Sequence, residues 1–365
     1  MGSEKKNPQF VEFLAEDTRL GADDATVLPG RLDRYSKAHH RALAMSDYAM
    51  KMSSASASPS WSDAYAKTAI KLRGCGNYLL FRDYYTVGKV RLHAATFCKK
   101  HLLCPLCAIR RGAKMVKAYM DKLAVIKAEN PHLKAYLVTL TVKDGPDLNE
   151  RFSHLHHSLQ RLHKTRTRQA QGQFNESCKA DAAVWSYEFK RGKNSGDWHP
   201  HVHAVWLCDI APDAVKLSAE WKKITGDSFI VDVTPFHDQD DVINGFLEVF
   251  KYAVKFSDLP MADNWEGYKI LSGKRLIASF GLFRGIEIPD DLTDKKLDDL
   301  PYIEMLYKHI FGVGYSLAPN HKKTKIISKE TNVLRSHGRA PMIASEPYKK
   351  GRAHLLKLRK KYPVE

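Results

Sequence analysis

Two histidines separated by a single valine stand in an apolar segment near the middle of the chain. Residues 201–207 read HVHAVWL and residues 183–189 read AVWSYEF, and both segments are rich in the β-branched and aromatic residues that favour strands. The polar sequence GKNSGD between them predicts a hairpin turn. Because successive side chains of a strand point to opposite faces, His201 and His203 leave the same face and can bind one ion.

The same hairpin predicts a third ligand. If its turn closes about residues 194–195, Glu188 lies opposite His201 on the same face. Two imidazoles and a carboxylate leave positions open for a substrate, which suits Mg²⁺ or Mn²⁺ acting as a Lewis acid on a phosphate. The alternatives are structural histidines that satisfy their own hydrogen bonds and an exposed strand glutamate. His199 is a weaker candidate because it precedes Pro200 at the end of the hairpin.

Further helices and strands alternate along the chain on either side of this hairpin. The patterns predict additional strands at 136–142, 229–233 and 275–283 and helices at 150–168, 211–224 and 241–257. This order indicates an α+β fold in which one sheet carries helices on one face. No GxGxxG or GxxxxGK[ST] sequence occurs, so a dinucleotide-binding fold and a P-loop ATPase are unsupported.

The helix expected at 241–257 presents chemically useful side chains on one face. Glu248, Tyr252 and Lys255 stand at i, i+4 and i+7, opposite an apolar arc, and Lys251 flanks them. Two ammonium groups beside a phenol can stabilise the phenolate and attract a phosphate, so Tyr252 is a candidate nucleophile. The alternative is an ordinary packing or surface tyrosine.

Cysteines gather in one short region upstream. The run FCKKHLLCPLC contains Cys98, Cys104 and Cys107, and Cys75 precedes it. Cys104 and Cys107 can point two thiolates at one Zn²⁺, and Cys98 with either Cys75 or His101 would complete a tetrahedron. The alternative is a set of free thiols. A nucleotide deaminase is excluded, because the order of cysteines and proline differs from its motif.

The charge of the chain points to a polyanionic partner. It has 58 Lys and Arg against 41 Asp and Glu, a net charge of +17, which fits nucleic acid or an anionic membrane. No apolar run approaches the length of a membrane span, and the start lacks a secretory or myristoylation signal. We therefore expect a cytoplasmic protein without a membrane partner. Two basic groups, Arg110 with Arg111 and the end of the 150–168 helix, either contact phosphates or form solvated helix faces.

Composition divides the chain into four parts. Residues 1–60 are polar and rich in small residues, which predicts a loosely ordered arm. We expect residues 61–133 to form a cysteine-rich, zinc-binding helical module and residues 134–286 to form a strand-rich domain that carries the predicted metal site and Tyr252. Residues 287–365 begin as an acidic linker and end as a basic tail, which either is solvated or contacts DNA.

Four segments, in this order, resemble the His-hydrophobic-His (HUH) endonucleases, and among these the rolling-circle plasmid replication initiator proteins with one catalytic tyrosine. The segments are LVTLTV (137–142), HPHVH (199–203), EVFKYAVKFSD (248–258) and KRLIASFGLFRG (274–285). The family pattern of Glu, Lys-Tyr, Lys and Asp is present here as Glu248, Lys251, Tyr252, Lys255 and Asp258. The resemblance covers roughly residues 70–285.

The resemblance implies an antiparallel sheet of the HUH-endonuclease type and metal-dependent nicking and rejoining of one strand at a plasmid origin. Tyr252 would attack phosphorus, leaving a 5′-phosphotyrosine and a free 3′-OH that primes synthesis. Glu248 would activate the water that ends the cycle. The implied partners are origin DNA, as duplex hairpin and single strand, together with a host helicase and replication machinery.

Two other functions remain open on the sequence. One is a relaxase or single-strand transposase of the same superfamily, which would share the metal site and the tyrosine. The other is a non-enzymatic, zinc-containing DNA-binding regulator, in which the histidines are structural and the basic tail supplies affinity. Covalent chemistry on DNA separates the second from the enzymes.

Overall fold

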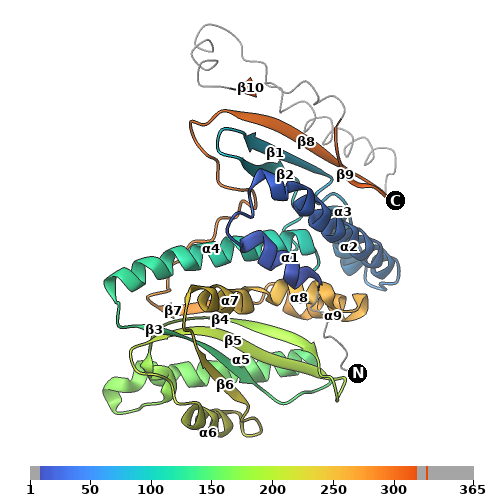
Figure 1. Cartoon of the computed structure of the whole chain (residues 1–365). Coiled ribbons are helices and arrows are strands. Elements are labelled where there is room, and N and C mark those ends of the chain that lie inside the picture. Colours follow the sequence, from blue (N-terminus) through green and yellow to red (C-terminus); the bar gives the residue numbers. More distant parts are fainter. Residues whose placement is uncertain (1–8, 319–325, 328–365) are drawn as a thin grey trace, which may run out of the picture.

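The computed structural model describes residues 9–318 and 326–327, which form two antiparallel sheets with helices between and around them (Figure 1). The second sheet in chain order contains the histidine hairpin. Its strands run in the order β6-β3-β5-β4-β7. Their bounds are β3 (Lys134–Thr141), β4 (Ala180–Arg191), β5 (Trp198–Cys208), β6 (Val231–Pro235) and β7 (Ile277–Gly281). The α+β class and the antiparallel pairing of this sheet are therefore as predicted.

Helices cover both faces of this second sheet. On one face lie α5 (Leu148–Lys164) and α6 (Ala214–Thr225), and on the other lie α4 (Pro105–Glu129), α7 (Gln239–Phe250) and α8 (Tyr252–Asp258) (Figure 1). The prediction of helices on one face is thus wrong. The reason is that β4 and β5 are apolar on both faces, so each face must be covered to leave water.

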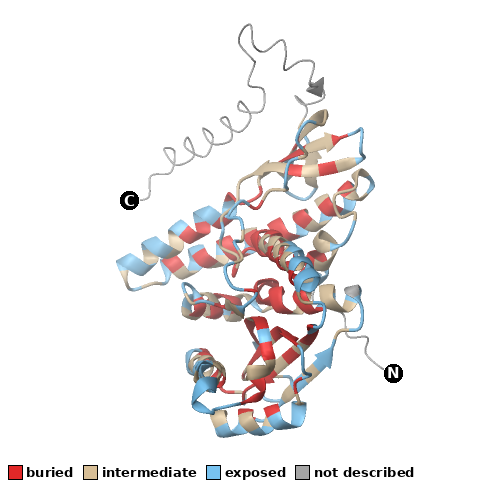
Figure 2. Cartoon of the chain, turned by 90° about the vertical axis from the view of Figure 1, so that its left-hand side faces the viewer, coloured by how far each residue is buried: buried red, intermediate tan, exposed pale blue. Residues whose placement is uncertain are grey.

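The side chains of β4, which point alternately to the two faces of the sheet, show how both faces are covered. Tyr187 and Phe189 pack with α5, whereas Ala182 and Val184 pack on the opposite face with the phenylalanines of α7. Apolar residues of α4 such as Tyr119 join that second cluster. The central strands β4 and β5 are largely buried, and Figure 2 shows buried strands in this sheet.

The first sheet joins segments that are far apart in the sequence. Its strands are β1 (Tyr78–Tyr84), β2 (Lys89–Ala95), β8 (Tyr302–Ile310), β9 (Gly314–Leu317) and β10 (Ile326–Ile327). Strand β1 pairs with β2 on one side and with β8 on the other. Residues 302–317, which we expected within a linker and tail, therefore complete a sheet of the N-terminal part. Most of the predicted basic tail lies outside the described residues.

The N-terminal region differs from the loosely ordered arm that we predicted. It forms α1 (Gln9–Thr18) and α2 (Leu28–Ser54), and α3 (Pro59–Arg73) follows. Buried small residues of α2, including Ala38 and Ala42, let this polar-looking helix pack closely. Residues 1–8 lie outside the described part.

Short 3₁₀ helices occupy Ala25–Val27, Thr165–Gln171 and Glu176–Lys179, and a further helix, α9, spans Met261–Leu271.

A buried charge network ties the N-terminal helices to α4. Arg110 Nη1 lies 2.8 Å from Asp17 Oδ2, and Arg31 Nη2 lies 2.9 Å from Asp294 Oδ2. Arg110 also contacts Asp294, and the Tyr35 hydroxyl donates to Asp17 Oδ2 at 2.8 Å. The network joins α1, α2 and α4 to the segment that precedes β8.

Among the helices of the described part, none is long and apolar enough to cross a membrane.

Candidate active site

The structure brings the three predicted metal ligands together on one face of the hairpin. The register pairs Glu188 with His201 and Ser186 with His203. Glu188 Oε1 lies 3.0 Å from His201 Nε2, and Glu188 Oε2 lies 3.6 Å from His203 Nε2. One ligand atom from each of the three residues lies within 4.8 Å of the other two. Alternation in two paired strands is sufficient to gather all three.

The protonation states of this group suit a divalent cation. Burial alone would raise the pKa of Glu188, but His201, Lys255 and His203 hold the pKa of this carboxyl well below its usual range. Burial lowers the pKa of His203 to about 3 and also lowers that of His201. An ionised carboxylate and neutral imidazoles are the forms that bind metal. Glu188 Oε2 is buried and has no hydrogen-bond partner among the described residues, so the donor set fits a cation that would contact it.

Contacts behind the imidazoles orient them. His201 Nδ1 lies 3.4 Å from the carbonyl oxygen of His199, and His203 Nδ1 lies 3.2 Å from the hydroxyl of Thr139 on β3. These contacts leave both Nε2 atoms facing Glu188. The His199 ring itself lies 2.6 Å from Asp144 Oδ1 and does not belong to the three-residue group.

The side chains that we expected on one helix face lie beside the Glu188, His201 and His203 group. The single helix that we predicted is divided into α7 and α8. Lys251 separates α7 from α8. Glu248 Oε2 lies 3.8 Å from His203 Nε2, Lys251 pairs with Glu248, and Lys255 pairs with Glu188. Burial lowers the pKa of Lys251 to about 8. A carboxylate and two cations therefore lie beside the histidines, where a phosphate could be held.

Tyr252 is placed differently from our expectation. We expected two ammonium groups beside its phenol, but these lysines pair with the two glutamates. The Tyr252 side chain is buried, and its ring centre lies 6.3 Å from that of His101. Burial raises the pKa of Tyr252 to about 12, and Arg111 opposes that rise. Sequence reasoning noted Arg111 only as a phosphate-contacting or surface residue.

The four predicted cysteines also come together. The sulfur of Cys75 lies 3.5 Å from those of Cys104 and Cys107, and that of Cys98 lies 3.6 Å from Cys107. Tetrahedral zinc with Zn–S bonds of about 2.3 Å holds its sulfurs roughly 3.8 Å apart, so this cluster fits the ion. Of the two alternatives for the fourth ligand, the geometry favours Cys75, because His101 lies against Tyr252 instead.

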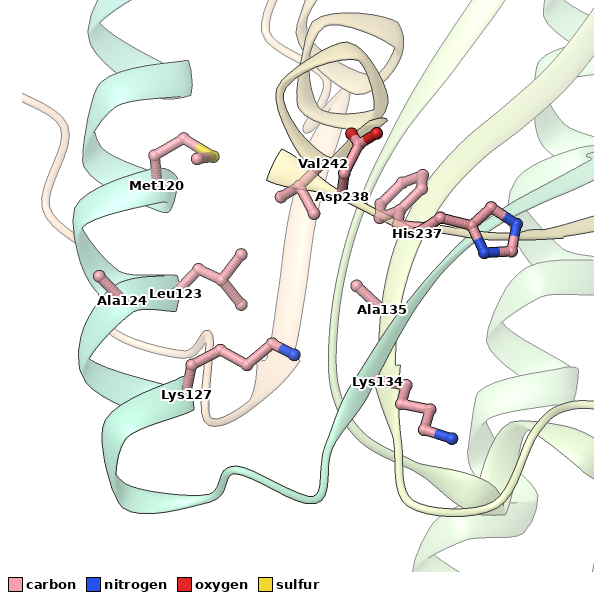
Figure 3. Close-up of a pocket in the computed structure, with 10 residues that line it drawn as sticks. Met120, Leu123, Ala124, Lys127, Lys134, Ala135, His237, Asp238 and Val242 are labelled. Carbon is pink, nitrogen blue, oxygen red and sulfur yellow. The ribbon is translucent and has the colours of Figure 1, made fainter. Parts of the chain in front are cut away.

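A separate pocket of about 360 Å³ lies at the other end of α7 (Figure 3). Apolar residues of α4 and α7 form its walls, with Lys127 and Lys134 at one end. Val242 of α7 lines it, whereas Glu248 near the end of that 12-residue helix faces the histidines. None of the predicted site residues lines this pocket.

Comparison with known proteins gives the family. Residues 89–309 match the family model described as "Replication protein", which is more than half of the chain. The chain belongs to this replication protein family, Rep_1. A protein named "Protein rep" from a Bacillus species is 27% identical over 276 residues, which cover 65% of this chain and 85% of that protein.

Two further relatives in this family carry the same name. "Protein rep" of Streptococcus pneumoniae serotype 2 (strain D39 / NCTC 7466) is 30% identical over 258 residues, covering 65% of this chain and 77% of the relative. That of Bacillus amyloliquefaciens is 26% identical over 280 residues, covering 66% and 78%. No solved structure matches the chain significantly. The three-residue metal group and Tyr252 lie within the part that matches the replication protein family.

Proposed function

We propose that this replication protein initiates rolling-circle replication of a plasmid by cutting and rejoining one strand at the origin. The observation that carries the proposal is the meeting of two independent motifs. The Glu188, His201 and His203 group and the Glu248, Lys251 and Lys255 face come from segments roughly 50 residues apart, yet they share one surface. The family membership and the net charge of +17 support a DNA substrate.

Each side chain of the site takes a role in this proposal. Glu188, His201 and His203 would hold Mg²⁺ or Mn²⁺, which when bound supplies Lewis-acid polarisation of a phosphate. Lys251 and Lys255 would bind the phosphate that Tyr252 attacks, giving a 5′-phosphotyrosine and a 3′-OH. Glu248 would then accept a proton from water, so that hydrolysis ends the cycle.

The remaining parts of the chain take supporting roles in this proposal. Cys75, Cys98, Cys104 and Cys107 would hold a structural zinc ion, and residues 134–286 would form the catalytic domain around a sheet of the HUH-endonuclease type. The substrate would be origin DNA, as duplex hairpin and as single strand. A host helicase would open the strands, and the host replication machinery would extend the 3′-OH in the cytoplasm.

The test uses a supercoiled plasmid that carries the DNA flanking the gene for this chain. The protein and Mn²⁺ should relax it and leave a denaturation-resistant protein–DNA adduct, which maps the nick. Tyr252→Phe should form no adduct. An adduct in Tyr252→Phe contradicts the assignment of the nucleophile, and origin binding without any adduct in the wild type favours the non-enzymatic regulator. If the protein joins its covalently bound strand to a second single strand but gives no replication product, a relaxase or transposase is favoured.

A further inference from the structure

The hairpin face that carries the metal group continues toward the turn by one more pair of residues. The register pairs Glu188 with His201 and then Lys190 with His199. Because side chains two residues apart in a strand point to the same face, Lys190 and His199 lie on the face of the metal ligands. Lys190 is exposed, whereas Glu188 and His201 are buried. This second pair is therefore where the site opens to solvent.

Three lysines lie on or beside this face, and they differ in their partners. Lys251 pairs with Glu248, and Lys255 pairs with Glu188. Of the three, Lys190 alone forms no ion pair within the described part of the chain. Its charge is therefore available to an anion that comes from outside the protein.

The carboxylate of Asp144, which also lies at this end of the hairpin, is held by other groups. Its Oδ1 lies 2.6 Å from His199 Nδ1, and its Oδ2 accepts a hydrogen bond of 2.6 Å from the Ser195 hydroxyl. A Cβ on Gly192 would collide with Asp144 Oδ2, so this glycine lets the carboxylate reach the turn. These contacts hold Asp144 against the turn and leave Lys190 without a carboxylate partner.

The backbone at this end of the hairpin is fixed on both sides of Lys190. Gly145 and Trp198 exchange two backbone hydrogen bonds, of 3.1 and 2.9 Å. The next residue of β4, Arg191, points to the opposite face, where its Nη2 lies 2.6 Å from Asp263 Oδ1 and its guanidinium lies 4.0 Å from the centre of the Trp198 ring. Lys190 thus extends from a rigid strand whose neighbouring cation is already occupied.

We propose that Lys190 binds a backbone phosphate of the DNA strand, next to the phosphate that the metal group holds, so that the strand runs along the hairpin face toward its turn. This inference rests on the proposed function, which puts the phosphate under attack at Glu188, His201 and His203. The Lys190 pair lies two residues beyond the Glu188 pair, about 6.8 Å along the strand. That length is close to the spacing of neighbouring phosphates in an extended single strand.

The chemistry of this contact is that of a point charge. A lysine ammonium binds phosphate without reading a base, so the contact would fix the register of the strand on the protein rather than its sequence. With a divalent cation at the metal group, two neighbouring phosphates of one strand would each meet a positive charge. The scissile bond would thereby be held in place at two points.

The experiment measures the equilibrium affinity of full-length Tyr252→Phe protein, with and without Mn²⁺, for a single-stranded oligonucleotide from the plasmid origin. A methylphosphonate replaces each phosphate in turn and removes one negative charge. The linkage at which the gain in affinity from Mn²⁺ disappears marks the phosphate at the metal group. At one of the two adjacent linkages, the replacement should weaken binding about tenfold in this protein and less than about twofold once Lys190→Gln is added.

Lys193→Gln is the matched control, because it removes one exposed positive charge from the turn of the same hairpin. It should leave the effect of the adjacent methylphosphonate at about tenfold, since a contact is specific to one phosphate whereas a distant charge acts on all of them. Lys190→Arg should retain most of the effect, because it keeps the positive charge.

Three results would overturn the proposed contact. The first is an equal effect of both adjacent methylphosphonates with and without Lys190→Gln, and the second is a loss of that effect in Lys193→Gln of the same size as in Lys190→Gln. The third is the absence of a Mn²⁺-dependent linkage, because no phosphate would then lie at the metal group. Failure of the proposed function is distinct: it appears in the plasmid assay, as an adduct in Tyr252→Phe or no adduct in wild type, whereas this coupling is measured as binding.

Discussion

Glu188 Oε1 on β4 lies 3.0 Å from His201 Nε2 on the neighbouring strand, and both side chains are buried. The hairpin register places the two residues directly opposite each other. A buried carboxylate costs free energy unless positive or donor groups surround it, and here Lys255 also contacts it. Variants of either residue are therefore best measured for metal binding and for folding separately.

Replacing Glu188 by glutamine keeps its shape and removes its negative charge. We expect the affinity for Mn²⁺ to fall by more than about tenfold, because losses of tenfold to 100-fold already follow changes outside the ligands themselves. This affinity is measured by a Mn²⁺ titration in which the electron paramagnetic resonance signal reports the free Mn²⁺. Glu150→Gln, at a site where the carboxylate is 59% exposed, is the control. Equal Mn²⁺ affinity in wild type and Glu188→Gln would show that the carboxylate is not a ligand.

Replacing His203 by alanine should abolish adduct formation while duplex origin binding stays within about threefold, because phosphate and base contacts lie elsewhere on the basic surface. Plasmid nicking and gel-shift assays on the same protein sample check this. His201→Ala should behave in the same way. If both activities fall together, the histidines serve folding instead.

The cysteine cluster should carry about one zinc ion per chain in protein purified without added metal. Cys104→Ser should lose the zinc and lower the melting temperature, and added Mg²⁺ should not restore it, because thiolates prefer zinc. Elemental analysis and thermal unfolding measure these effects. Cys178→Ser is the control, since Cys178 lies outside the cluster. A folded, active wild type without zinc would refute the site.

Replacing Asp294 by asparagine should destabilise the protein by about 3–5 kcal/mol at pH 7, because it leaves two buried guanidinium groups short of a partner. Burial opposes ionisation of this carboxyl, yet Arg110 and Arg31 hold its pKa well below its usual range. The folded pKa is therefore below the unfolded value of about 3.9. The stabilisation is present above that value and is lost as the pH falls further.

The difference in unfolding free energy between wild type and Asp294→Asn should accordingly shrink below about pH 4. Denaturant unfolding at pH 7, 5 and 3 measures it. Asp63→Asn, which removes an exposed partner of Lys67, should change stability by less than about 0.5 kcal/mol. An unchanged difference at pH 3 would indicate that the ionised carboxylate is not what stabilises the network.

The sequence by itself determined the groupings that depend on a local repeat. The two-residue period of a strand and a hairpin turn are sufficient to place Glu188 opposite His201. Spacing within one short run likewise predicted that Cys104 and Cys107 share a site, and the helical period predicted that Glu248 and Lys255 share a face. These relations follow from backbone geometry that every strand or helix has.

Tertiary structure decided the relations between distant segments. The pairing of β1 with β8, the choice of Cys75 over His101 and the packing of the His101 ring against Tyr252 each join parts of the chain that no local period relates. Tertiary structure also decided the division of the predicted helix at Lys251 and the burial of both faces of the second sheet. The physical reason is that burial of apolar surface acts on the whole chain, whereas periodicity constrains only residues within one element.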